Sequence, residues 1–379
     1  MVRLTRCRLR WFFPLLALAI CLPTAVAWAN AGPPRFSGNT GGPLLPGKSD
    51  QVHVLGEILR FDLAPDFSRA TVTARYTLAN RGPALDDQPF IFVVQEGRET
   101  AALTASWQGE PLAVEAVDLA QFTPEERAEM AGAWGTVDVW MDPVTGEPYT
   151  PGAFVGTDPV VSYYRFTVDL PAGATGELTV RYEQPSAWDR TRYALRVHHY
   201  QYLVLPARGW ASFGPLEVRV AAPEGSRYYF AANLDFRRED GEYVAEYPGL
   251  PQANLSFAVM DRSGLFLGPH PGPYYWLGFA VVLALAVAIG AGIGRAAGRL
   301  PGRGWALGVG TVGGLLLGGA LDLWLAVNLL MALPALREQS YGPAFVGIGQ
   351  GLVAAVVSAG VANRVAVRTW RRRHGGSVA

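Results

Sequence analysis

The chain has 379 residues, of which 50% are hydrophobic and 17% are charged, and its 32 basic residues balance 32 acidic ones. Because the net charge is zero, no excess of basic side chains is available for a nucleic acid, and we expect no nucleic-acid partner. Both cysteines, Cys7 and Cys21, lie within a segment at the N-terminus that resembles a signal peptide. Removal of that segment would exclude disulfides, thiolate metal sites and cysteine nucleophiles.

The first 29 residues have the layout of a secretory signal peptide. Basic residues between Arg3 and Arg10 precede an apolar run, and Ala27 and Ala29 supply the small side chains of a cleavage site. The alternative is a retained transmembrane helix, which is disfavoured because the run is short and contains two prolines. We therefore expect a signal peptide over 1–29, followed by a flexible Gly/Pro-rich segment over 30–50.

Residues 51–263 contain many short segments with the pattern of β-strands. The run from Val72 to Leu78 alternates apolar and polar side chains, as in a strand with one buried face. Such strands, separated by turns, predict a mainly β domain, a β-sandwich of one or two units. A capping box that begins at Thr123 predicts a helical insertion near 123–134.

Part of this domain resembles the N-terminal β-saddle domain of M1-type aminopeptidases. The resemblance rests on Tyr-Thr-Leu-Ala-Asn at 76–80, Trp-Gln-Gly-Glu-Pro-Leu at 107–112, Leu-Pro-Ala-Gly at 170–173 and Leu-Thr-Val-Arg-Tyr at 178–182. It covers about half of the chain and implies a fold only. Those enzymes carry His-Glu-x-x-His on a later catalytic domain, and this sequence has no such motif. No peptidase activity is therefore expected.

Three apolar stretches, 274–294, 305–336 and 343–363, follow a linker over 264–273. The first and third match the roughly 20 residues that span a bilayer as a helix, and the second is too short for two spans. Arginines cluster after the first stretch and in the tail over 364–379. An odd number of spans places both clusters in the cytoplasm. We therefore expect a three-helix transmembrane bundle, with the β domain outside and the tail inside.

Small residues recur at every fourth position of these stretches, which lets helix backbones approach closely in lipid. The glycines expected to pack are Gly290, Gly294, Gly310, Gly314, Gly318, Gly347 and Gly351. The alternative is that the stripes reflect only the glycine-rich composition of the chain.

Asp322 is the one acid in the three stretches and lies four residues beyond Gly318. A carboxylate at the centre of a membrane helix costs about 2.5–3.5 kcal/mol on insertion scales. We therefore expect Asp322 to face the bundle and, protonated, to hydrogen-bond Gln350, with Asn328 as a second neighbour. The alternative is a hydrated position near the outer interface, where an acid costs little.

The sequence contains no serine-nucleophile, phosphate-binding or dinucleotide motif, and we expect no enzyme, cofactor or metal site. His198 and His199 are adjacent on an expected strand, so they point to opposite faces and do not suit one metal. Trp134, Trp140 and Trp188 are candidates for an aromatic binding surface, with core packing as the alternative.

These features predict a non-enzymatic, multi-pass membrane protein of the bacterial cell envelope. Its partners would be the lipid bilayer and a protein, glycan or peptide bound by the β domain outside. The alternative is an accessory subunit of a transporter or signalling complex that acts through its helices. A hydrolase of envelope polymers ranks lower, because no sequence motif supports it. It stays an alternative because paired carboxylates need only meet in space and leave no motif.

Overall fold

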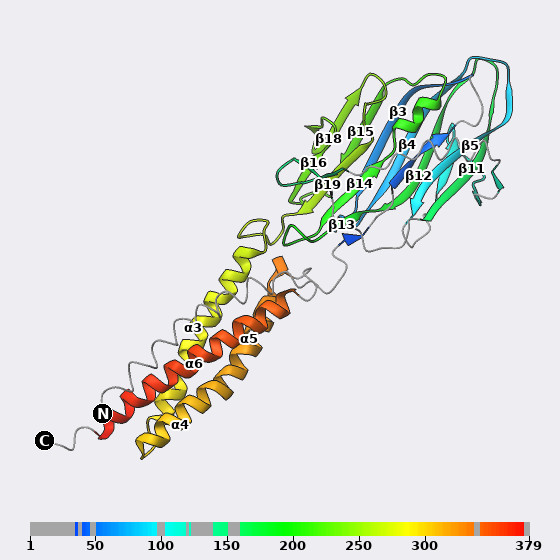
Figure 1. The fold of residues 1–379 in the computed structure, drawn as a ribbon. Coiled ribbons are helices and arrows are strands. Elements are labelled where there is room, and N and C mark those ends of the chain that lie inside the picture. The colour runs from blue at the N-terminus through cyan, green and yellow to red at the C-terminus, as the bar shows by residue number, and fades with distance from the viewer. Residues whose placement is uncertain are drawn as a thin grey trace. The chain divides into compact units, whose positions relative to one another are not determined.

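The structure is a computed structural model, and it describes residues 35–36, 40–45, 51–96, 103–118, 121–122, 139–150, 160–336 and 342–374. These form two compact units, a β domain and a unit of long helices that also includes residues 192–195 (Figure 1). This division confirms the predicted fold class, a mainly β region followed by an apolar helix bundle. The expected signal peptide and the helical insertion near 123–134 lie outside the described residues.

The β domain contains two sheets, of which one has eight strands. Its centre is antiparallel, and β15 joins β3 in a parallel pair. From one edge to the other, the strands are β17 (Arg237–Glu239), β18 (Glu242–Tyr247), β15 (Leu216–Ala221), β3 (Val52–Leu63), β4 (Arg69–Asn80), β12 (Thr175–Pro185), β6 (Thr104–Trp107) and β7 (Glu110–Pro111).

The second sheet has nine strands and is also largely antiparallel. Along its main path lie β1 (Arg35–Phe36), β13 (Ala187–Asp189), β14 (Val197–Tyr202), β2 (Thr40–Leu45), β5 (Leu85–Glu96), β11 (Val160–Leu170) and β8 (Glu115–Val117). Strand β19 (Leu255–Asp261) pairs with both β14 and β16 (Tyr228–Ala232). A two-stranded hairpin, β9 (Trp140–Met141) with β10 (Pro148–Tyr149), and a 3-10 helix η2 (Leu205–Gly209) complete the domain.

Strand β2 corrects one prediction from the sequence. The whole segment 30–50 was expected to be flexible, but Thr40–Leu45 pairs with β5 and β14, and Leu44 is buried. Pro43 lies within the register shift between Gly41 and Leu44. A proline at such an irregular position does not interrupt a regular ladder of hydrogen bonds.

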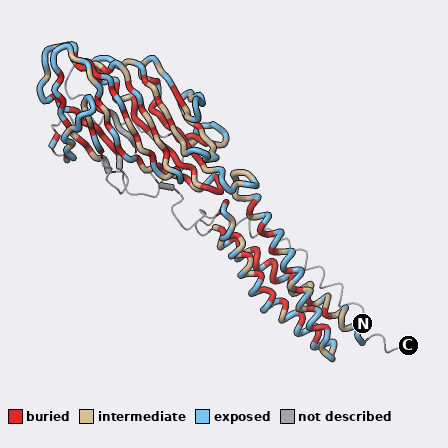
Figure 2. The backbone as a smooth tube through the Cα atoms, turned by 180° about the vertical axis from the view of Figure 1, so that it is seen from behind, coloured by how far each residue is buried: buried red, intermediate tan, exposed pale blue. Residues whose placement is uncertain are grey.

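The inner faces of the two sheets form one apolar core. Alternation predicted for Val72 to Leu78 is confirmed, because every second side chain of that run is buried, and Figure 2 shows the same alternation along other strands. Aromatic rings fill the centre: Phe257 stacks on Tyr200 at 5.0 Å and meets Phe61 edge-on at 5.1 Å between centroids. Full burial of one phenylalanine contributes about 1.5–3 kcal/mol.

Three helices of the second unit are long and apolar enough to cross a membrane: Gly272–Ala297, Arg303–Ala332 and Gly342–His374. The first is α3 and the third is α6. The second consists of α4 (Arg303–Gly313), a π-helical turn η3 (Gly314–Gly318) and α5 (Gly319–Ala332). Large apolar side chains point outward from these helices, among them Val287, Leu316, Leu317, Leu352 and Val356. This pattern indicates contact with lipid.

Two helix ends differ from the sequence expectation. The second apolar helix ends at Ala332 instead of residue 336, and a short 3-10 helix, η4 (Pro334–Leu336), follows it. Pro334 explains this stop, since proline lacks the N–H that a continuing helix needs. Helix α6 continues to His374, so most of the predicted tail 364–379 is helical. Arginine is a good helix former and does not terminate α6.

Candidate functional site

Asp322 and Gln350 are both buried in the helix bundle, with 0% and 2% of their surface exposed. The predicted hydrogen bond between them is wrong. The Gln350 amide Nε2 instead donates to the backbone oxygen of Tyr275 on α3, at 2.9 Å. Neither carboxylate oxygen of Asp322 has a hydrogen-bond partner among the described residues. The burial of Asp322 also argues against the hydrated, interfacial alternative.

Asn328, the second expected neighbour, is exposed, and its Nδ2 donates to the backbone oxygen of Trp324 at 2.7 Å. Six residues separate Asn328 from Asp322, which rotates the side chain about 240° around the helix. Asn328 therefore lies on another face, and its amide is satisfied by the preceding turn of its own helix.

The structure places the seven expected packing glycines at contacts between helices. A Cβ atom built on Gly314 would lie 2.7 Å from the Cα of Ala359, and one on Gly347 would lie 2.8 Å from the Cα of Val327. Comparable close contacts occur at Gly290, Gly294, Gly310, Gly318 and Gly351. Real Cβ atoms do not approach backbone this closely, so a larger residue at most of these positions would separate the helices.

The three candidate tryptophans do not form one binding surface. Trp140 is buried, and its ring centroid lies 3.9 Å from that of His199. Trp188 pairs with His198, so it belongs to the opposite face of the sheet. Trp134 lies outside the described residues. The prediction is wrong for Trp140, because the β9–β10 hairpin packs that ring against β14 instead of presenting it.

Trp188 is half-buried, and two arginines lie near its ring. The guanidinium carbons of Arg190 and Arg196 lie 4.5 Å and 4.9 Å from the centroid of its ring. Such contacts stabilise an aromatic ring through its electron-rich face. This ring is therefore already occupied by side chains of its own domain.

His199 belongs to a buried polar cluster that the sequence did not indicate. The Tyr149 hydroxyl donates to Asp189 Oδ2 at 3.1 Å and lies 3.1 Å from His199 Nε2. Asp189 Oδ1 accepts from the backbone N–H and the hydroxyl of Thr191, both at 2.7 Å. Burial holds the pKa of His199 well below its usual value, so the ring is neutral. These hydrogen bonds hold the β9–β10 hairpin against β13 and β14 of the nine-stranded sheet.

His198 points to the other face of β14, as predicted for adjacent residues of a strand. Its Nδ1 lies 2.8 Å from the Ser186 hydroxyl, and burial lowers its pKa to about 4. Both histidines are thus neutral at ordinary pH and serve as hydrogen-bonding groups of the domain interior.

Glu57 is a buried acid in the core between the two sheets, with 4% of its surface exposed. The Tyr202 hydroxyl donates to Glu57 Oε1 at 3.5 Å and lies 2.9 Å from the Tyr76 hydroxyl. Burial raises the pKa of Glu57 to about 8, so the side chain is a neutral carboxylic acid at pH 7.

A β-bulge in β3 places Glu57 inside. The pairing with β4 shifts between Val54 and Gly56, which leaves Leu55 as the extra residue. Even-numbered residues face inward before the bulge and odd-numbered ones after it. The same switch is visible in the sequence, where the apolar residues change from positions 52 and 54 to positions 59, 61 and 63. This signal could have revealed the bulge.

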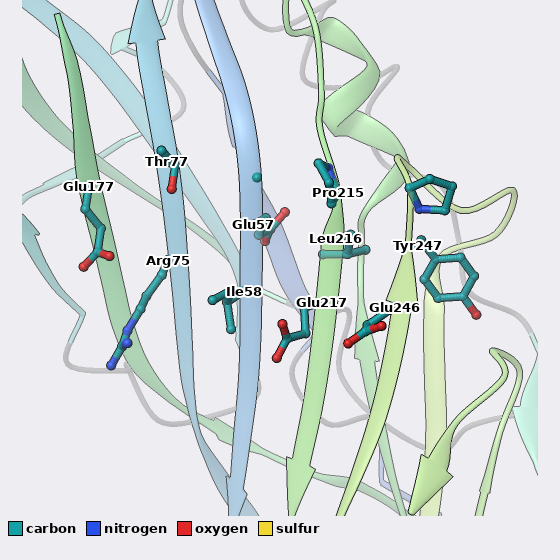
Figure 3. A pocket seen from close by; sticks show the side chains of 12 residues that line it. Glu57, Ile58, Arg75, Thr77, Glu177, Pro215, Leu216, Glu217, Glu246 and Tyr247 are labelled. Atoms are coloured by element: carbon teal, nitrogen blue, oxygen red, sulfur yellow. The ribbon is translucent and has the colours of Figure 1, made fainter. Parts of the chain in front are cut away.

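Above the bulge, the outer face of the eight-stranded sheet has a shallow depression of about 550 Å³ (Figure 3). Its lining includes Ile58, Arg75, Thr77, Glu177, Glu217, Glu246 and Tyr247. Glu217 and Glu246 are directly opposite on β15 and β18, a placement that like charges destabilise. Arg219 contacts Glu217, and Arg237 lies 2.9 Å from Glu246, so each carboxylate has its own cation.

Because Glu217 and Glu246 are paired with Arg219 and Arg237, the depression carries charges of both signs, with Arg75 also in its lining. Glu177 lies at its rim, where its carboxylate accepts from the Thr179 hydroxyl at 3.4 Å. Ile58 is 41% exposed and adds an apolar contact. An open, mixed surface of this kind suits a peptide or a protein loop better than an enclosed small molecule.

No protein-family profile and no curated protein sequence matches the chain. Solved structures show a weak likeness of fold to part of the chain. A Legionella pneumophila protein, provisionally described as nutrient-binding, is 12% identical over 59% of this chain and 72% of its own, with a TM-score of 0.37. An M1 zinc metallopeptidase from Deinococcus radiodurans is 13% identical over 56% of this chain and 43% of its own, with a TM-score of 0.28.

Leukotriene A4 hydrolase from Saccharomyces cerevisiae is 8% identical over 56% of this chain and 30% of its own, with a TM-score of 0.32. The chain thus spans less than half the length of either of these two enzymes. The expected resemblance to the M1-type N-terminal domain is confirmed as a weak likeness of fold, and it carries no activity to this protein.

Proposed function

We propose that the protein is a non-enzymatic, membrane-anchored binding protein of the bacterial cell envelope, with its β domain outside the membrane. The observation that carries this proposal is the set of three helices long and apolar enough to cross a bilayer, attached to a separate β unit. The partner is a peptide or a protein segment, and the depression of the eight-stranded sheet is its site.

The arginines support the proposed orientation. Arg295 lies in the last turn of the first span, Arg299 falls between the first and second spans, and Arg364 and its successors end the third. Three spans put these groups on one side of the membrane, and cytoplasmic segments are enriched in arginine.

Cysteine labelling in whole cells tests this orientation, because a mature chain without its signal peptide has no other thiol. A membrane-impermeant maleimide should label Asp240→Cys, in the β17–β18 turn, before lysis. The matched variant Pro301→Cys, between α3 and α4, should react only after lysis. Labelling of Pro301→Cys in intact cells would contradict the proposed orientation.

Photo-crosslinking tests the binding site. A photoreactive amino acid in place of Thr77, in the depression, should trap a protein partner in living cells. The same amino acid in place of Thr167, exposed on β11 of the other sheet, is the matched control. We expect Glu177→Arg to reduce the Thr77 product at least several-fold, since it reverses a charge at the rim. Identical products at both positions would argue against a site in the depression.

A second candidate is an accessory subunit of a membrane transporter or signalling complex. The unpartnered carboxylate of Asp322 favours it, because an acid held inside membrane helices is costly and marks function more often than anchoring. Replacing residues 272–374 by an unrelated anchor of the same orientation separates the candidates. Retained function would assign the work to the β domain, and lost function with normal surface abundance would assign it to the bundle.

A further inference from the structure

Four buried oxygen atoms of the helix bundle have no hydrogen-bond partner among the described residues. They are Asp322 Oδ1 and Oδ2, Gln350 Oε1 and Ser358 Oγ. The three side chains are exposed by 0%, 2% and 0% of their surface. Buried polar atoms in proteins are almost always hydrogen-bonded, so a group of such exceptions in one bundle indicates a role besides packing.

Two of these side chains lie on one face of α6. Gln350 and Ser358 are eight residues apart, with Ala354 midway between them, and residues at this spacing follow one stripe of a helix. The stripe spans about 12 Å along the helix axis. All three residues are buried, so the stripe faces the interior of the bundle.

Asp322, on α5, lies level with the middle of this stripe. On one side of it, a Cβ built on Gly351 would lie 2.6 Å from the Cα of Leu323. On the other side, a Cβ built on Gly319 would lie 2.9 Å from the Cβ of Ala355. Asp322 is flanked by these two contacts and is fully buried, so it lies inside the bundle at a level between Gln350 and Ser358.

The helix geometry changes immediately before Asp322. Residues Gly314–Gly318 form a π-helical turn, and π turns within α-helices are frequent at functional sites. A Cβ built on Gly318 would lie 2.5 Å from Ser358 Oγ, so the end of this turn is in contact with the stripe. The irregular turn and the unpartnered oxygens are independent observations on the same interface.

Asp322 has no counter-ion within the described bundle. On α3, the titratable groups are Tyr274 and Tyr275 at one end and Arg295 at the other. Helix α6 carries no charged residue before Arg364, and the same helix as Asp322 has none between Arg303 and Ala332 apart from Asp322 itself. No cation of the described bundle is therefore available to pair with an ionised Asp322, and a bound proton makes the carboxyl group neutral.

We propose that Asp322 is a reversible proton-binding site inside the membrane, reached through hydrogen-bonding groups of Gln350 and Ser358 together with water. The carboxylate takes up one proton to become a neutral carboxylic acid and returns the same proton on ionisation. Ten residues, about 15 Å of helix, separate it from the end of α5 at Ala332. This inference concerns the bundle alone and does not depend on what the β domain binds.

Infrared titration of the full-length protein in phosphatidylcholine–phosphatidylglycerol vesicles tests the proposal. In the Glu57→Gln background, which removes the other buried acid, the carbonyl stretch of a protonated carboxyl group should decrease as the pH is raised beyond the range in which exposed carboxylates titrate, and adding Asp322→Asn should abolish that change. Ser358→Ala should shift the midpoint by about one pH unit toward higher pH, because it removes a hydroxyl that would stabilise the ionised carboxylate through a bridging water. Ser358→Thr should restore the midpoint. A merely structural serine would leave it unmoved, and that result would overturn the role of Ser358.

A second measurement uses the wild-type chain, so its result does not depend on whether the variants fold. Dicyclohexylcarbodiimide, an apolar reagent that modifies protonated carboxyl groups in membranes, should label Asp322, and mass spectrometry should show less labelling as the pH rises. A water-soluble carbodiimide at the same concentration should label it at least tenfold less. Labelling of Asp322 that does not vary with pH, or an infrared band that does not titrate, would overturn the proposal.

Discussion

The β domain and the helix bundle each bury a carboxyl group, and they treat it differently. Glu57 lies among tyrosine hydroxyls that give its oxygen a partner. Asp322 lies among small and apolar side chains, and its two oxygens have none. Burying a polar group is tolerated when hydrogen bonds compensate for lost hydration. The difference indicates that hydrogen bonds hold Glu57 in the core of its domain, whereas Asp322, under the proposal above, binds and releases a proton.

The largest effect should come from the ionisation of Glu57. Its pKa is about 8 in the folded domain and near 4.5 in an unfolded chain, so the folded state holds the proton more tightly. The contribution of Glu57 to the free energy of unfolding is therefore fully present below pH 4.5. It falls as the pH rises between 4.5 and 8, and it is absent above pH 8. We expect a difference of several kcal/mol across this window, which Glu57→Gln should remove.

Thermal unfolding of wild type and Glu57→Gln at pH 6 and pH 9 measures this effect. The variant should gain stability relative to wild type at pH 9. If the two proteins lost stability equally between these pH values, Glu57 would be ionised in the fold, and the contrast with Asp322 would disappear.

A smaller effect should follow from overpacking the bundle. Gly347→Ala adds a methyl group next to the backbone of Val327, and overpacking of this kind typically costs about 1–3 kcal/mol. Gly349→Ala is the matched control, because a Cβ there meets no atom within 4 Å. The control should be neutral or stabilising, since alanine is the better helix former. Unfolding in detergent, followed by circular dichroism, compares them. Equal stabilities would mean that the helices are not closely packed at Gly347.

The smallest effect should come from the hairpin of the β domain. Tyr149→Phe removes the hydroxyl between Asp189 and His199 but keeps the ring, and the loss of one such group costs about 1–2 kcal/mol. Trp140→Phe, which keeps the hydroxyl and reduces the packing on His199, is the companion variant. Chemical denaturation of each compares the two contributions. An unchanged midpoint for Tyr149→Phe would show that the hydroxyl cluster does not fasten the hairpin.

Sequence reasoning succeeded where one local pattern decides the structure. The alternation from Val72 to Leu78 depends on a two-residue period, and the apolar helices depend on length and hydropathy. It failed where contacts join distant segments. Strand Thr40–Leu45 forms only because β5 and β14 accept it as a neighbour. The partner of Gln350 depends on how α3 and α6 are rotated about their axes, which no spacing within one helix determines.

The position of β19 in the sheet affects the order of events during synthesis. This last strand of the domain lies between β14 and β16, and only ten residues separate its end at Asp261 from the start of α3 at Gly272. In the proposed orientation, the chain crosses the membrane from its N-terminus, so it cannot complete this sheet until its first apolar helix has reached the translocation channel. Folding of the β domain and insertion of the anchor thus fall in the same interval, and long-range strand pairing makes such folding slow.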